Sequence, residues 1–86
     1  MDLLIYLYGR AGQIDQARGY LQTLCAAHGI AYTFAEAEDS KEGAIFTIQG
    51  YGGSSEEITD ELTELLGKLI LALRLTVRTD EQYRGV

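Results

Sequence analysis

Residues 30–51, IAYTFAEAEDSKEGAIFTIQGY, decide how this chain folds. From Ile30 to Ala37 bulky β-compatible side chains alternate with alanine and threonine, which is typical of a strand. From Ala44 to Tyr51 the alternation returns, with Phe46 and Ile48 on the face expected to be buried. The residues between the two runs are polar and end in glycine, as turns do. The stretch therefore predicts a β-hairpin.

A strand and a helix are predicted before the hairpin. Residues 3–8, LLIYLY, are β-compatible and stop at Gly9. From Gln13 onward the apolar positions recur at intervals of three and four, which indicates an amphipathic helix that ends before Gly29. Its expected buried stripe is Ile14, Ala17, Leu21, Leu24, Cys25 and His28.

A second helix and a last strand are predicted after the hairpin. Ser54 and Glu57 have the spacing of a capping box, so a helix is expected to begin there. The apolar positions from Leu69 onward fit both a helix and a strand, so the pattern leaves two ends for this helix, near Leu66 or near Ala72. We favour Ala72, with a strand over residues 75–79.

The resulting order is strand, helix, strand, strand, helix, strand. This order is the split pattern of the ferredoxin-like α+β sandwich, a βαββαβ fold with a four-stranded antiparallel sheet and two helices on one face. With 86 residues the chain is expected to form a single ferredoxin-like domain over residues 1–79, followed by a polar C-terminal tail over residues 80–86.

The composition argues against several functional classes. The longest apolar run is shorter than the ~20 residues of a membrane helix, and the first residues lack a secretory signal, so a cytoplasmic protein is expected. Cys25 is the only cysteine and His28 the only histidine, which leaves no metal-binding cluster. We therefore expect no catalytic residue, no metal and no cofactor, and we predict that the protein is not an enzyme.

Negative charge is concentrated in the middle of the chain. The net charge is −6, and residues 35–66 contain Lys41 as their only cation. Such a field disfavours direct nucleic-acid binding and anionic membranes, because both need a basic surface. An acidic face on the second helix and the hairpin turn is predicted instead to bind a basic partner protein. The acidic face comprises Glu57, Asp60, Glu61, Glu64, Glu38, Asp39 and Glu42.

The sheet surface away from the helices is a second candidate. If Leu3, Ile5 and Leu7 point at the helices, the alternate residues of the strands lie on the open side. A half-apolar surface with tyrosines suits a contact between proteins, so a homodimer is expected. The residues assigned to it are Leu4, Tyr6, Tyr8, Ile45 and Thr47.

The turn after the first strand is a candidate anion loop. Gly9, Arg10 and Gly12 combine backbone donors and one cation with the start of a helix. Gly9-Arg10 resembles the first-strand loop of acylphosphatases, which share this topology. That family pairs its arginine with a catalytic asparagine, and the chain contains no asparagine, so acylphosphatase activity is not expected.

Three functional hypotheses follow. The first is a non-catalytic acidic interaction module, an inhibitor or regulator that docks on a basic, nucleic-acid-binding protein. The second is a small-molecule-binding regulatory domain that acts as a dimer. The third is a cofactor-free enzyme resembling dimeric ferredoxin-like oxygenases, which would need a cavity lined by inward polar groups such as Tyr32 and His28.

Overall fold

The computed structural model describes residues 2–36, 43–50 and 56–82. In chain order they form β1 (Asp2–Tyr8), α1 (Ala11–His28), β2 (Tyr32–Glu36), β3 (Gly43–Ile48), α2 (Glu56–Leu71) and β4 (Thr76–Gln82). The predicted βαββαβ order is thereby confirmed.

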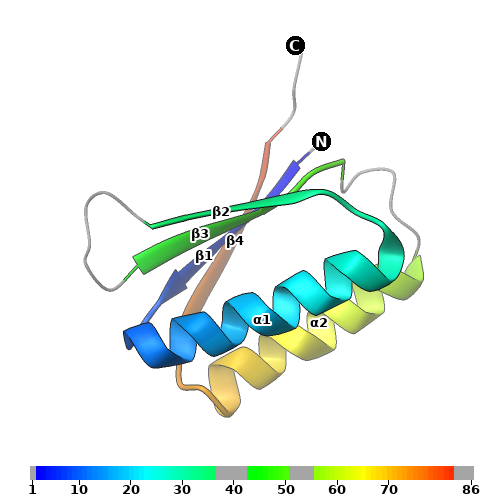
Figure 1. Cartoon of the computed structure of the whole chain (residues 1–86). Helices are drawn as coiled ribbons and strands as arrows, with labels where there is room; N and C mark the ends of the chain where they lie inside the picture. The colour runs from blue at the N-terminus through cyan, green and yellow to red at the C-terminus, as the bar shows by residue number, and fades with distance from the viewer. Residues whose placement is uncertain (1, 37–42, 51–55, 83–86) are drawn as a thin grey trace.

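The strands form one antiparallel sheet in the order β2-β3-β1-β4. Each helix connects two strands that are not neighbours, because β3 lies between β1 and β2, and β1 lies between β3 and β4. Both helices cover the same face of the sheet (Figure 1). The chain therefore has the predicted ferredoxin-like α+β fold, and no helix within residues 2–36, 43–50 and 56–82 covers the other face of the sheet.

The core lies between this sheet and the two helices. Leu3, Ile5 and Leu7 of β1 and Phe46 and Ile48 of β3 are buried there, as their alternation predicted. The helices contribute Ile14, Ala17, Leu21, Cys25, Leu62 and Leu69. Burial raises the pKa of the Cys25 thiol, which is consistent with its expected role as a core residue.

Helix α1 ends where glycine was predicted to stop it. Gly29 adopts the left-handed conformation at φ 65° and donates its N–H to the carbonyl of Ala26. The next N–H, of Ile30, bonds to the carbonyl of Cys25 at 2.9 Å. These bonds satisfy carbonyls at the helix end that would otherwise have no partner.

Of two predicted boundaries near the C-terminal end, one agrees with the structure and the other does not. Helix α2 continues to Leu71, so the favoured end near Ala72 is confirmed and the end near Leu66 is wrong. The last strand extends to Gln82, although residues 80–82 were expected to belong to a polar tail. Gln82 pairs with Asp2 and Asp80 with Leu4, so hydrogen bonding to β1 outweighs the polar composition of this segment. Ser54, the predicted helix cap, lies outside the described residues.

Neither α1 nor α2, within the residues described, is long and apolar enough to cross a membrane.

Candidate functional site

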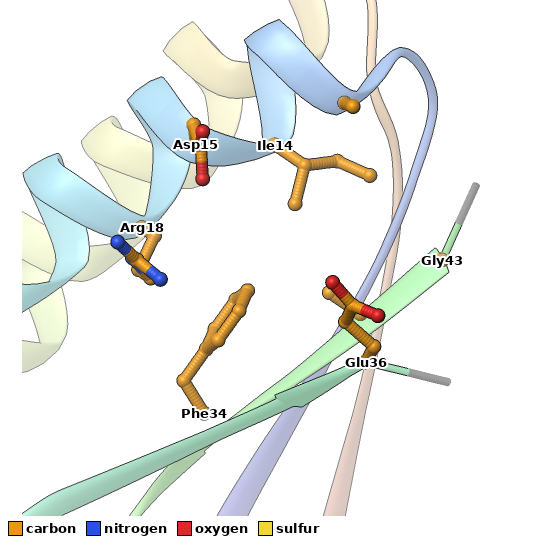
Figure 2. A pocket seen from close by; sticks show the side chains of 8 residues that line it. Ile14, Asp15, Arg18, Phe34, Glu36 and Gly43 are labelled. Atoms are coloured by element: carbon orange, nitrogen blue, oxygen red, sulfur yellow. The ribbon is translucent and has the colours of Figure 1, made fainter. Parts of the chain in front are cut away.

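A cavity of about 160 Å³ separates the first turns of α1 from the β2–β3 hairpin (Figure 2). Helix α1 lines it with four side chains, while the two strands supply the opposite wall (Figure 2). The lining residues are Ala11, Ile14, Asp15, Arg18, Phe34, Glu36, Gly43 and Ala44. We call this space the hairpin cavity.

The hairpin cavity combines an apolar floor with three charges at its rim. Ile14 and Ala44 are buried, whereas Asp15, Arg18 and Glu36 are exposed to solvent. The guanidinium of Arg18 lies over the ring of Phe34, 5.1 Å from its centroid, which is within the range of a cation–π contact. Among the described residues no ion pair joins Arg18 to Asp15 or to Glu36.

The local structure explains how these residues meet. Ala11, Ile14, Asp15 and Arg18 follow one another at intervals of three, one and three, which places them on one face of α1. Phe34 and Glu36 are two residues apart on β2, so both point to the helix side of the sheet. Small residues on both walls leave the space between them unfilled.

Sequence reasoning missed this cavity. The sequence alone assigned Asp15, Arg18 and Glu36 to no candidate site. One signal was available in the sequence. Glu36 is two residues from Phe34, so its carboxylate is expected on the same, inner face of the edge strand.

A second space, of about 300 Å³, lies beside the candidate anion loop. It is lined by Gly9 and Arg10 of the β1–α1 turn, by Gln13 of α1, and by Leu73 and Arg74 of the α2–β4 turn. Arg74 adopts a positive φ of 58°, unusual for a residue with a side chain. Gly12 does not line this space, and the contribution of Arg74 was not predicted.

The acidic face is described only in part. Asp60, Glu61 and Glu64 are exposed on α2, as expected for residues that could meet a partner. Glu61, however, binds the Nε2 atom of His28 through its Oε2 atom at 2.6 Å, so it ties α2 to the end of α1. Glu38, Asp39 and Glu42 lie outside the described residues, as does the side chain of Glu57.

The open sheet face has the residues assigned to it. Strand register aligns Leu4 with Thr47 and Asp80, and the next row aligns Tyr6 with Ile45 and Arg78. Arg78 lies over the ring of Tyr6, 4.6 Å from its centroid. Leu4 is almost fully covered at 9 % exposure, whereas 36 % of Tyr8 is exposed.

No protein-family model and no curated protein matches the chain. Its fold is similar to that of the de novo designed protein Ferredog-Diesel, with a TM-score of 0.59, 13 % identity and coverage of 94 % of this chain and 85 % of the other. It is also similar to the 1.40 Å crystal structure of a "putative antibiotic biosynthesis monooxygenase" from Deinococcus radiodurans. That match has a TM-score of 0.52 and 17 % identity, and covers 100 % of this chain and 96 % of the other.

What these structures share with the chain is the fold. The cavity required by the enzyme hypothesis is not one of the two spaces described above, because neither is lined by Tyr32 or His28. Tyr32 stacks on Phe46 with a centroid distance of 5.1 Å, and His28 is bound to Glu61. In the described part of the chain no group of three or more histidine, cysteine or acidic residues is arranged to hold a metal.

Proposed function

We propose that the chain is a non-catalytic interaction module that docks on a basic protein through the acidic face of α2 and works as a homodimer. The observation that supports it best is the pair Asp60 and Glu64, both exposed and one turn apart on α2. Among the described residues neither carboxylate has an ion-pair partner.

The nearby basic residues form no ion pair with these two carboxylates. Lys68 lies over the ring of Tyr20 on α1, 4.8 Å from its centroid, and His28 is bound to Glu61. Negative charge on the outer side of α2 is therefore available to attract a basic protein and to orient it on approach.

Affinity capture tests the docking proposal. We expect the tagged protein to retain a basic partner from its native lysate at about 0.1 M salt and to lose it at about 1 M salt, where the screening length falls from ~10 Å to ~3 Å. The double variant Asp60→Asn, Glu64→Gln should lose the same partner at low salt, as read by quantitative mass spectrometry.

The matched control is Asp15→Asn, Glu36→Gln, which removes two exposed acids away from α2 and from the open sheet face and gives the same net charge. It should retain the partner. Equal loss of the partner in both double variants would mean that binding depends on net charge and not on α2. Equal retention of the partner in both would contradict docking at α2.

The homodimer is proposed to form through the open sheet face. Tyr6, Ile45 and Thr47 give this face a half-buried, partly apolar centre. Arg78 and Asp80, both exposed, give β4 one charge of each sign on that face. A two-fold axis can place Arg78 of one copy against Asp80 of the other, so the face is complementary to itself.

Light scattering after size exclusion tests the dimer. We expect a mass of twice 9.5 kDa for the protein and 9.5 kDa for Ile45→Glu, because a buried carboxylate in the interface would have no partner. Tyr20→Glu, at an exposed position of α1, should keep the dimer mass, and circular dichroism should confirm that both variants fold. A monomeric wild type, or a dimeric Ile45→Glu, would refute the interface.

A second candidate is the small-molecule-binding domain, favoured by the hairpin cavity. The description of the Deinococcus radiodurans protein points weakly to an enzyme, but at 17 % identity the likeness supports the fold and not a reaction.

A further inference from the structure

The hairpin cavity has features that the docking proposal does not use. Its volume of about 160 Å³ is below the ~300–1,000 Å³ of pockets for drug-sized ligands, so its occupant must be a small molecule. Its floor is apolar through Ile14, Phe34 and Ala44, and its three charged side chains are exposed to solvent.

The signs of those charges restrict the occupant. A simple cation would be attracted by Asp15 and Glu36 but would meet Arg18, and a simple anion would meet two carboxylates. A neutral apolar molecule would make no ionic contact with the three exposed side chains and would forgo the attraction that they offer. A molecule with one charge of each sign avoids each of these penalties.

The spacing of the charges indicates how close the two ligand charges must be. Asp15 and Arg18 are three residues apart on α1, so their Cβ atoms are about 5–6 Å apart. Arg18 forms no ion pair with Asp15, and its guanidinium lies over the ring of Phe34 of β2. The carboxylate of Asp15 and the guanidinium of Arg18 are thus close together but not paired. This arrangement suits a ligand whose ammonium and carboxylate groups are also close together, as they are in an α-amino acid.

We propose that the hairpin cavity binds a small apolar α-amino acid as its zwitterion. The ammonium group is held by Asp15 and Glu36, the carboxylate by Arg18, and the aliphatic side chain by Ile14, Phe34 and Ala44. The guanidinium can present two N–H donors to the carboxylate, which gives this contact its direction.

Binding of L-valine and two analogues tests the proposal. Isobutylamine keeps the ammonium group and the branched chain, and 3-methylbutanoate keeps the carboxylate and the branched chain. Calorimetry and ¹⁵N chemical shifts on the full chain should show L-valine binding at least about tenfold more tightly than either analogue, with shifts at Ile14, Phe34 and Ala44. Tenfold corresponds to about 1.4 kcal/mol.

Three variants assign the contacts. Arg18→Gln should lower the affinity for L-valine to that for isobutylamine. Glu36→Gln should weaken the binding of L-valine and of isobutylamine, and the binding of 3-methylbutanoate should stay unchanged or become tighter. Ala11→Leu, at an exposed rim position, should block all binding by filling the cavity. Glu64→Gln on α2 is the matched control and should bind L-valine like the wild type.

The outcomes are decisive in both directions. Absence of saturable L-valine binding, equal binding of isobutylamine, or unchanged binding by Ala11→Leu would each overturn the proposal. Circular dichroism confirms that each variant is folded. Because Asp60 and Glu64 do not line the cavity, this result is independent of docking at α2.

Discussion

Replacing Phe46 by alanine is expected to lower the free energy of unfolding by about 3–5 kcal/mol, the cost of deleting a buried aromatic ring. Phe46 is fully buried at the centre of β3, stacked on Tyr32 and in edge contact with Phe34 at a centroid distance of 6.4 Å. Since domains of this size are stable by about 5–15 kcal/mol, the loss should leave a substantial unfolded population. Urea unfolding followed by circular dichroism measures it, as a lower midpoint at an unchanged slope.

Phe46→Leu is the matched variant for this experiment. It keeps an apolar side chain in the core and should cost less than Phe46→Ala, because it leaves a smaller void. A Phe46→Ala midpoint close to that of the wild type would mean that the β2–β3 hairpin does not depend on this ring. The stacking arrangement on the helix side of the hairpin would then need another explanation.

Gly9→Ala is expected to be the second most damaging change. A Cβ atom at Gly9 would lie 2.5 Å from Cδ2 of Leu75, whose side chain is itself buried. Gly9 also has a φ of 157°, which side-chain-bearing residues rarely adopt. Overpacking and backbone strain each cost about 1–3 kcal/mol, so the urea midpoint should fall markedly.

Gly19→Ala is the matched control for Gly9→Ala. Gly19 is in the interior of α1, and a Cβ atom there would have no neighbour within 4 Å. Alanine favours a helix over glycine by about 1 kcal/mol, so this variant should be more stable than the wild type. Equal effects of the two substitutions would contradict the close approach of the β1–α1 turn to Leu75.

The hairpin shows why so much of the fold followed from pattern alone. Alternation in residues 30–51 and helical spacing around Leu21 depend on which face of an element is buried, and a compact chain must bury its apolar face. Phe46 and Ile48 were therefore assigned to the core, and they are completely buried. The end of α2 was less certain, because Leu69 and Leu73 fit both the helical spacing and the alternation of a strand.

The candidate sites depended more on tertiary structure. The hairpin cavity joins Asp15 and Arg18 to Glu36, and no local pattern relates residues so distant in the chain. The same holds for Arg74 beside Arg10, and for Glu61 bound to His28. Each of these contacts arises because helices and strands far apart in sequence are brought together by the order of the strands in the sheet.

The sequence by itself determined the kinds of elements, their order, the buried faces and hence the ferredoxin-like fold. These properties depend on local conformational preference and on the side-chain period of each element. Only the tertiary structure decided that β4 continues to Gln82, that Glu61 binds His28, and that three charges surround an apolar cavity. Those features depend on distances across the sheet and between layers, which strand pairing and helix packing fix after the local elements are chosen.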